Sequence, residues 1–375
     1  MILGIDAISN PSGGGKRHLI EILSHYNTTK FKFEKIVIWS TNDFLSEIND
    51  ESHIEKKSHY LLNKGYLFRL IWILFFRRNA YKSLDIIFSP FGTYFSNNKK
   101  YVSMSQNILP FDLYEISQFG FIYKLKFFLL RLLQKKSFKN AKGVIFISNY
   151  ARSIINKEFS LDHLNLKVIN HGISSDFDSP PKTQKSIKLY SLKSPLKLLY
   201  VSSIWPYKHH LEVVRAVSKL RNDGFPISLT IIGNNDYPIL GATLKSYINL
   251  FDIKSEYIFW KQNIGINDIC SYYSQADAFI FSSTCENMPN ILIEAMSSGL
   301  PILCSKSMPM PEFLLDAGVY FDANNVNDIS EKIKDFINDV VLRTKISSKS
   351  YELAKKYSWQ KCADETFEFL YQNTL

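Results

Sequence analysis

The sequence predicts an α/β protein with two domains, each built on a parallel β-sheet that helices cover on both faces. Three observations lead to this fold class. The chain has 375 residues, more than one ordinary core accommodates. Its short apolar runs have the length of buried strands, and segments with helical periodicity alternate with those runs along the whole chain. This alternation is typical of Rossmann-like domains.

Six strands are predicted in each half. In the first half they are residues 1–7, 35–40, 84–90, 100–105, 143–148 and 166–172. In the second half they are residues 196–203, 227–233, 256–260, 277–283, 301–305 and 318–322. Most of these runs hold several apolar residues in succession, as expected for strands buried on both faces.

The segment between the halves predicts a linker, because residues 174–195 are rich in Ser, Pro and Lys and show no clear period. We therefore expect a first domain over 1–175, a linker over 176–195, a second domain over 196–357 and a terminal helix over 358–375. The last residues predict two helices interrupted near Ser358 and Trp359, the second of which returns to the first domain. Parallel sheets bind ligands beyond the carboxyl ends of their strands, so two facing domains would create one cleft.

Composition restricts the compartment and the partners. The net charge is +10, and residues 51–150 alone carry 16 Lys+Arg against 5 Asp+Glu. The four cysteines lie in the second half without metal-ligand spacing, and the amino terminus lacks signal-peptide features, so we expect a reduced, cytoplasmic protein. No apolar window reaches the length of about 18 residues that a membrane-spanning helix needs.

Two glutamates follow the predicted strand at 277–283. Pro289 suits the first turn of a helix with Asn287 or Met288 as its N-cap, and Gly299 suits its end. Glu286 would then lie at the helix start and Glu294 more than one turn along it. Amides at a helix start can hold a phosphate, so this pattern suits a nucleotide sugar, with one carboxylate toward the sugar and the other toward the ribose. The alternative is a capping charge and a solvated helix residue.

Residues 283–301 resemble the E-x7-E signature of retaining glycosyltransferases with the GT-B fold, in the large family 4, the glycosyl transferases group 1. Further similar stretches are residues 198–210, 229–236, 273–305, 310–322 and 357–359, with weaker ones at 13–18, 143–155 and 168–174. The resemblance implies a GT-B fold, that is, two Rossmann-like domains facing across a cleft.

The resemblance also implies roles for residues of the second half. Lys208 matches the basic residue that binds the donor diphosphate, and Ser203 stands where relatives often have an arginine. Glu286 would position the sugar and Glu294 the ribose. The expected donor site is completed by Gly233, Asn287, Met288, Pro289 and Asn290. The alternative for Lys208 is a surface lysine.

In the first half, Gly14 and Gly15 follow the first predicted strand, where glycines allow close approach to a phosphate or a sugar; the alternative is a flexible turn. Gln106 and Asn107 stand where many relatives have a His-Asp pair facing the sugar, but amides cannot act as acid or base near neutral pH. His171 is a further candidate for the cleft, or a packed histidine.

Metal binding is not expected, and neither is a cofactor. Asp176 and Asp178 resemble a D-x-D metal motif, but they fall in the predicted linker. Lys208 and helix amides would neutralise the diphosphate instead.

Basic and aromatic residues alternate in residues 63–82 and 123–142, as in helices that lie in a membrane interface. Arg77, Arg78, Lys135 and Lys136 are the cations expected to contact an anionic membrane surface. The alternative is a core-facing stripe made by Leu125, Phe128, Leu129 and Leu132. Nucleic acid is not an expected partner, because no binding motif accompanies the charge.

The sequence therefore predicts a cytoplasmic glycosyltransferase, peripheral at the inner face of the membrane. Its donor would be GDP-mannose or a UDP-sugar, and its acceptor a saccharide, lipid-linked, in surface polysaccharide assembly. Two alternatives stay open: a sugar-nucleotide epimerase, which needs no acceptor, and a non-catalytic, membrane-associated nucleotide-sugar binder.

Overall fold

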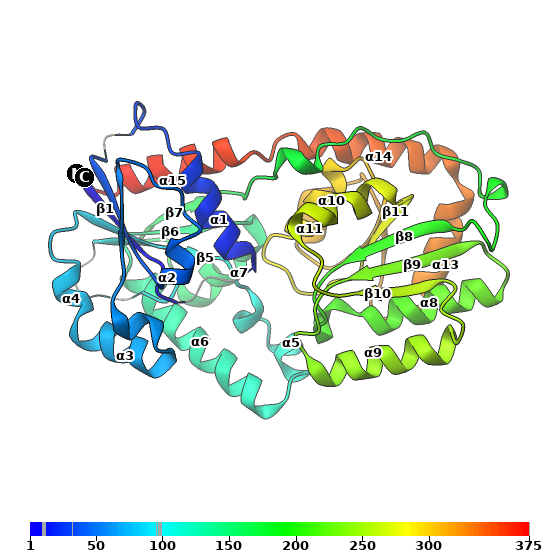
Figure 1. Ribbon diagram of the computed structural model, residues 1–375, viewed down its shortest axis with the longest axis horizontal. Helices are drawn as coiled ribbons and strands as arrows, with labels where there is room; N and C mark the ends of the chain where they lie inside the picture. Colours follow the sequence, from blue (N-terminus) through cyan, green and yellow to red (C-terminus); the bar gives the residue numbers. More distant parts are fainter. Residues whose placement is uncertain (10–12, 32, 95, 97–99, 375) are drawn as a thin grey trace. The chain divides into compact units, whose positions relative to one another are not determined.

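The chain folds into two compact units, which we describe separately (Figure 1). The structure is a computed structural model that describes residues 1–9, 13–31, 33–94, 96 and 100–374. The first unit comprises Met1–Ile116, Gly120–Gly172 and Tyr357–Leu375. The second comprises Ser117–Phe119 and Ile173–Lys356.

The first unit is built on a parallel sheet, which has seven strands in the described residues, in the order β3-β2-β1-β4-β5-β6-β7. These are β1 (Ile2–Asp6), β2 (Lys35–Trp39), β3 (Ile54–Lys57), β4 (Ile86–Ser89), β5 (Tyr101–Ser105), β6 (Gly143–Phe146) and β7 (Asn165–Val168). The six strands predicted in this half are confirmed. Strand β3 was not predicted, because it pairs only with β2 at the sheet edge and none of its residues is buried.

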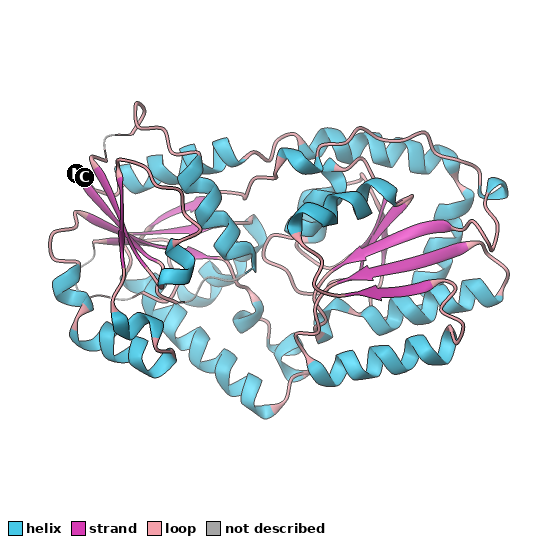
Figure 2. Cartoon of the chain, viewed as in Figure 1, coloured by secondary structure: helices cyan, strands magenta, loops and turns pink. Residues whose placement is uncertain are grey.

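Helices lie on both faces of this sheet (Figure 2). They are α1 (Gly13–Ser24), α2 (Asn42–Leu45), α3 (Tyr66–Phe75), α4 (Arg77–Ala80), α5 (Leu113–Ser117), α6 (Phe121–Asn140), α7 (Asn149–Phe159) and α15 (Trp359–Gln372). Two short 3-10 helices are η1 (Tyr60–Asn63) and η2 (Leu109–Phe111). Among the described residues, no helix combines the length and the apolar character needed to cross a bilayer.

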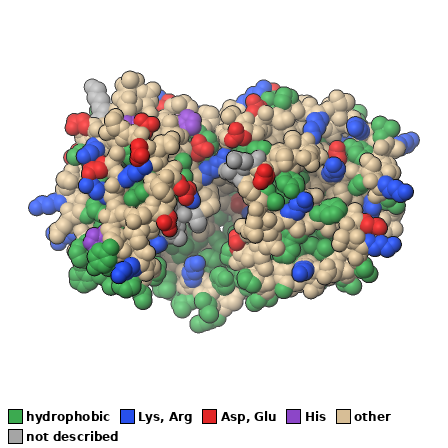
Figure 3. Space-filling model, in the orientation of Figure 1, with side chains coloured by type: hydrophobic (Ala, Val, Ile, Leu, Met, Phe, Trp, Pro, Cys, Tyr) green, Lys and Arg blue, Asp and Glu red, His purple; other side chains and the backbone are tan. Residues whose placement is uncertain are grey.

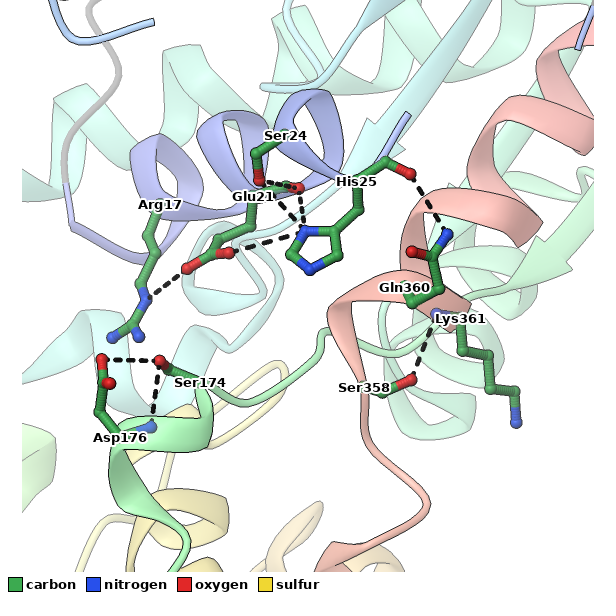
Figure 4. Close-up of polar contacts among 9 residues, drawn as sticks. All are labelled: Arg17, Glu21, Ser24, His25, Ser174, Asp176, Ser358, Gln360 and Lys361. Carbon is green, nitrogen blue, oxygen red and sulfur yellow. Dashed lines mark hydrogen bonds and ion pairs between the residues drawn. The ribbon is translucent and has the colours of Figure 1, made fainter. Parts of the chain in front are cut away.

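The terminal helix α15 packs on α1 within the first unit. Gln360 Nε2 donates a hydrogen bond to the His25 carbonyl at 3.3 Å, at the end of α1 (Figure 4). Ser358 caps α15 through the Lys361 amide at 3.2 Å, and the preceding break separates it from α14 (Val340–Ala354). The predicted interruption near Ser358 and Trp359 is therefore confirmed.

The second unit holds a six-stranded parallel sheet in the order β10-β9-β8-β11-β12-β13, counted over the described residues. Its strands are β8 (Leu196–Val201), β9 (Ile227–Ile232), β10 (Ile258–Lys261), β11 (Ala278–Phe281), β12 (Ile302–Ser305) and β13 (Val319–Phe321). All six were predicted. Strands β11 and β12 are buried at every residue, which explains their uninterrupted apolar sequences.

The helices of the second unit cover both faces of its sheet. They are α8 (His210–Asn222), α9 (Pro238–Phe251), α10 (Ile266–Gln275), α11 (Asn290–Ser297), α12 (Met310–Leu314), α13 (Val326–Asn338) and α14. The 3-10 helices are η3 (Ser175–Phe177), η4 (Ile187–Leu189) and η5 (Pro206–Lys208). Residues 178–186 contain no helix or strand, which agrees with the lack of a helical or strand-like hydrophobic period in this part of the sequence.

Candidate functional site

The strand order of the second unit reverses between β8 and β11, which are hydrogen-bonded neighbours although β9 and β10 lie between them in sequence. In open parallel sheets, ligands bind beyond the carboxyl ends of the strands at such a point, because the two following loops diverge to opposite faces. The loop after β8 carries Lys208, and the loop after β11 carries Glu286. The topology therefore brings these two predicted residues to one place.

Lys208 and Glu286 form an ion pair between Lys208 Nζ and Glu286 Oε1. Their side chains are only 8% and 15% exposed, so the pair is shielded from water. A buried lysine needs such a partner, since an unpaired charge in this environment is costly. Lys208 is therefore not a solvated surface lysine. An ammonium group has three N–H donors, so the contact with Glu286 leaves capacity for phosphate oxygens.

Backbone contacts fix the loop that carries Lys208. The Lys208 carbonyl accepts hydrogen bonds from Tyr200 Oη and, at 2.8 Å, from Ser282 Oγ. One residue earlier, the Tyr207 carbonyl accepts from the Thr284 amide at 2.9 Å. These bonds join the loop after β8 to the loop after β11 beside the ion pair. The position of the Lys208–Glu286 pair is thus set by the folded sheet.

The helix that carries Glu294 begins at Asn290, one residue later than an N-cap at Met288 would give and two later than one at Asn287. Pro289 is the N-cap of α11, so the prediction of Asn287 or Met288 in that role was wrong. Proline brings no polar side chain to cap the first turn. Gly299 follows the end of α11 with φ +61°, which confirms the predicted stop.

Glu294 lies at the middle of α11 and is partly buried. Its Oε2 accepts a hydrogen bond of 3.0 Å from Tyr273 Oη, on α10. Glu286 lies before the helix and Glu294 in its second turn, as the spacing predicts. Tyr273 was not predicted; the sequence signals that point to it are its position before the buried strand β11 and its place at the start of the similar stretch 273–305.

Gly233 and Ser203 follow β9 and β8 at the same edge of the sheet. A Cβ atom on Gly233 would lie 1.8 Å from the Ser202 carbonyl oxygen, so only glycine permits this approach of the two loops. The Gly233 carbonyl accepts from Trp260 Nε1 at 2.9 Å. Gly233 thus shapes the edge through its backbone. Ser203, half-buried next to it, brings no positive charge to this edge.

An aromatic cluster that sequence reasoning missed lies on the same loops. Phe119 is 3% exposed and contacts Trp205, Tyr207 and Tyr237, with ring centroids 5.9, 6.5 and 5.7 Å away. The Tyr207 ring also lies 5.2 Å from Lys208 Nζ. Phe119 is distant in sequence from its partners, so no local pattern could reveal the cluster.

Two buried histidines follow Lys208. Burial lowers the pKa of His209 to about 4 and that of His210 to about 3, so both are neutral at physiological pH. His209 Nε2 lies 2.9 Å from Thr284 Oγ1, and the His210 ring stacks on Tyr200 at 4.6 Å. Both rings pack within the loop as neutral groups, so the positive charge at this point of the loop comes from Lys208.

In the first unit, three predicted residues share one cluster at the carboxyl end of the sheet. A Cβ on Gly15 would lie 3.1 Å from Gln106 Oε1, and Gln106 Nε2 lies 3.4 Å from His18 Nδ1. His18 stacks on His171 with ring centroids 4.6 Å apart, and both are buried. Burial and the neighbouring His171 hold the pKa of His18 well below its usual value.

Other candidates of the first unit have local partners. Gly14 is exposed in the first turn of α1. Asn107 is exposed, and its Oδ1 accepts from the Leu109 amide at 3.0 Å in a turn. The two basic residues that follow the glycines are paired within the first unit: Lys16 with Glu47 at 2.5 Å, and Arg17 with Glu21 at 3.6 Å (Figure 4).

The D-x-D motif contributes its carboxylates to protein contacts. Asp176 Oδ2 accepts from Ser174 Oγ at 2.9 Å, and Asp178 Oδ1 accepts from Tyr351 Oη at 2.8 Å. Across the part of the chain that the structure describes, no three His, Cys, Asp or Glu side chains gather as a metal site. The four cysteines are free thiols.

The four predicted membrane cations differ in environment. Arg78, Lys135 and Lys136 are exposed. Arg77 is only 12% exposed, pairs with Asp6 at 3.7 Å and lies over the Tyr94 ring at 4.5 Å. The expectation that Arg77 contacts a membrane therefore conflicts with the structure, where it anchors α4 to the sheet.

The alternative of a core-facing stripe on α6 was also wrong. Leu125, Phe128, Leu129 and Leu132 are 47–56% exposed. The residues of α6 that are buried are Phe127, Gln134, Ser137 and Phe138.

Comparisons with known proteins place the second unit in a family. Residues 182–353 match the family described as glycosyl transferases group 1. O-antigen chain mannosyltransferase B of Escherichia coli is 25% identical over 62% of this chain and 61% of its own length. O-antigen chain mannosyltransferase RfbU of Salmonella typhimurium is 24% identical over 63% of this chain and 65% of its length. The chain thus spans under two thirds of these two relatives.

Solved structures show the fold. WaaG, a glycosyltransferase involved in lipopolysaccharide biosynthesis, superposes with a TM-score of 0.72 at 16% identity over 99% of both chains. HepE of Anabaena, solved in complex with UDP-glucose, gives 0.71 at 15% identity over 98% of both. These likenesses, with the two parallel sheets, identify the fold as GT-B. Residues 182–353, which make up most of the second unit, therefore match a glycosyl transferases group 1 domain.

Proposed function

We propose that the protein is a retaining glycosyltransferase that moves a sugar from a nucleoside-diphosphate donor to a saccharide acceptor. The buried Lys208–Glu286 pair at the β8/β11 switch point is the observation that carries this proposal. A cation beside a carboxylate suits a sugar diphosphate, because one binds the phosphates and the other the sugar hydroxyls. The relatives named as mannosyltransferases support GDP-mannose as donor, and the structure solved with UDP-glucose supports a UDP-sugar.

In the proposed reaction, an acceptor hydroxyl oxygen attacks the anomeric carbon on the face from which the diphosphate departs. The new glycosidic bond forms as the bond to the diphosphate oxygen breaks, and the departing phosphate accepts the hydroxyl proton. Lys208 and the first amides of α11 stabilise the developing phosphate charge, so no metal ion is required. Glu286 positions the sugar, and Glu294 holds the ribose.

The proposed acceptor is a lipid-linked saccharide in surface polysaccharide assembly, with the protein peripheral at the inner face of the membrane. The first unit exposes an unusual amount of apolar surface on two helices (Figure 3). Soluble monomers rarely expose large contiguous apolar patches. On α3, the most exposed side chains are Tyr66, Leu67, Leu74 and Phe75, at 69–75%. On α6, Phe121 and Ile122 reach 79% and 80%.

The charges on these helices favour an anionic membrane over a second copy of the chain. Lys124 and Lys126 are exposed on α6 between its apolar residues, and Arg78 is exposed on α4. A symmetric dimer through α6 would place like charges opposite each other. Anionic headgroups would instead attract each exposed cation by about 1 kcal/mol, while the apolar side chains insert between the lipids.

A vesicle-pelleting assay tests the membrane proposal. The variant Phe121→Ser/Ile122→Ser should bind vesicles containing phosphatidylglycerol at least about tenfold less tightly, because each large apolar side chain contributes more than about 1.4 kcal/mol when buried. The matched control is Ile239→Ser/Ile253→Ser in the second unit, where the wild-type side chains are 74% and 84% exposed. Equal pelleting of all three proteins would contradict the proposal, and dimerisation lost in the first variant would identify a second copy as the partner.

A thermal-shift panel of nucleoside diphosphates and nucleotide sugars tests donor binding. A donor present at about 100 times its Kd should stabilise the protein by about 2.7 kcal/mol. Binding followed by release of an altered free sugar nucleotide without acceptor would indicate an epimerase. Binding without any turnover would indicate a nucleotide-sugar binder, and stabilisation by none of the panel would contradict all three functions.

A further inference from the structure

The side chain of Glu294 is held by a buried tyrosine that lies outside the glutamate signature. Tyr273 is 1% exposed, and its Oη lies 3.0 Å from Glu294 Oε2 and 3.5 Å from the Ile291 carbonyl. A phenol has one O–H, and a carboxylate is the stronger acceptor at the shorter distance. Tyr273 therefore donates to Glu294.

The ring of Tyr273 is itself fixed by aromatic neighbours. It stacks on Phe279 of β11 with centroids 5.7 Å apart and meets the edge of Phe177 at 5.4 Å. The Phe177 carbonyl accepts from Ser298 Oγ at 3.2 Å, just after the end of α11. These contacts hold the Tyr273 ring in place, so its hydroxyl favours the orientation of the Glu294 carboxylate that accepts this hydrogen bond.

We propose that Tyr273 is a positioning residue that pre-orients Glu294 for the two ribose hydroxyls of the donor. This rests on the proposed role of Glu294 toward the ribose. Ordering a glutamate side chain costs conformational entropy, which a ligand would otherwise have to offset on binding. A carboxylate offers about four acceptor positions on its two oxygens, so the bond from Tyr273 is compatible with two further hydroxyl donors.

The test measures Kd by calorimetry for the tightest-binding nucleoside diphosphate and for its 2′,3′-dideoxy counterpart, which lacks both hydroxyls. The variant Tyr273→Phe keeps the ring and removes the hydroxyl. We expect it to bind the ribose nucleotide about tenfold more weakly, as for loss of a hydrogen bond to a charged group, with unchanged affinity for the dideoxy nucleotide. An equal loss for both nucleotides, or no loss for either, would overturn the positioning role.

A matched control is Tyr257→Phe in the same unit. Tyr257 is 6% exposed, and its Oη donates to the Phe251 carbonyl at 2.7 Å, away from Glu294. Tyr257→Phe should leave the affinities for both nucleotides unchanged. If it weakened binding of the ribose nucleotide as much as Tyr273→Phe does, the effect would come from removing any buried tyrosine hydroxyl, and the positioning role would be contradicted. The variant Glu294→Ala separates the two proposals. If Glu294→Ala binds the ribose nucleotide as tightly as wild type, the ribose contact of Glu294 is contradicted. If Glu294→Ala binds it more weakly and Tyr273→Phe does not, only the positioning role of Tyr273 is contradicted.

Discussion

Breaking the Lys208–Glu286 pair from either side should destabilise the second unit, and removing both charges should restore it. Lys208→Met leaves Glu286 as a carboxylate that is 15% exposed, and Glu286→Gln leaves a cation that is 8% exposed. An uncompensated charge of a buried pair costs about 3–5 kcal/mol, and residual solvent contact favours the lower end, about 3 kcal/mol. The double variant leaves no charge unpaired and should lie within about 1 kcal/mol of wild type.

Urea unfolding measures the free energy of unfolding of the wild type, the two single variants and the double variant. Hydrogen exchange of the β8 and β11 amides then shows whether the loss lies in the second unit. With a urea dependence of about 2 kcal/mol per M, a loss of 3 kcal/mol should lower the midpoint by about 1.5 M. For catalysis we expect the opposite pattern: kcat/KM stays low in the double variant, because both groups act on the donor together. The stabilising ion pair would be refuted if the single variants were as stable as wild type. It would also be refuted if the double variant lost as much stability as the two single variants together.

Three further predictions concern the same molecule. Glu294→Ala should weaken binding of the nucleoside diphosphate itself, whereas Glu286→Ala should mainly lower turnover of the intact donor; equal nucleotide affinity in Glu294→Ala and wild type would exclude the ribose contact. Activity should persist in EDTA, and its complete loss with recovery in Mg2+ or Mn2+ would show that a metal is needed. Burial lowers the pKa of His210 from 6.5 to about 3, so the unfolded chain binds a proton between these values that the folded chain does not. This contribution to stability is present above pH 6.5 and is lost as the pH falls toward 3, by about 1.4 kcal/mol per pH unit. His210→Phe should therefore gain stability relative to wild type by about 2 kcal/mol between pH 6.5 and 5 in urea titrations, and a pH-independent difference would rule out the buried neutral histidine.

The sheets were predictable because strands buried on both faces need continuous apolar sequences. This holds for β11 and β12, which are buried at every residue. Edge strand β3 escaped prediction because its residues Ile54–Lys57 are mostly polar and pair on one side. The start of α11 was misplaced because proline is typical of the first helical position, whereas Pro289 here precedes the first helical residue.

The site was predictable in its residues more than in its contacts. Spacing and resemblance selected Lys208 and Glu286, but their pairing joins positions 78 residues apart and depends on β8 lying beside β11. Tyr273 and Phe119 were missed for the same reason, since their partners come from other elements. Arg77 was misassigned because charge counts do not tell an exposed cation from one paired with Asp6 inside the fold.

Sugar transfer itself is the most direct test of the central claim. The purified protein is incubated with radiolabelled donor and a lipid-linked saccharide acceptor, and released nucleoside diphosphate and labelled lipid are both quantified. We predict equal molar amounts of the two products, no turnover without acceptor, and loss of both products in Lys208→Met/Glu286→Gln. Donor consumption without labelled lipid, or full activity in that double variant, would contradict glycosyl transfer at the Lys208–Glu286 site.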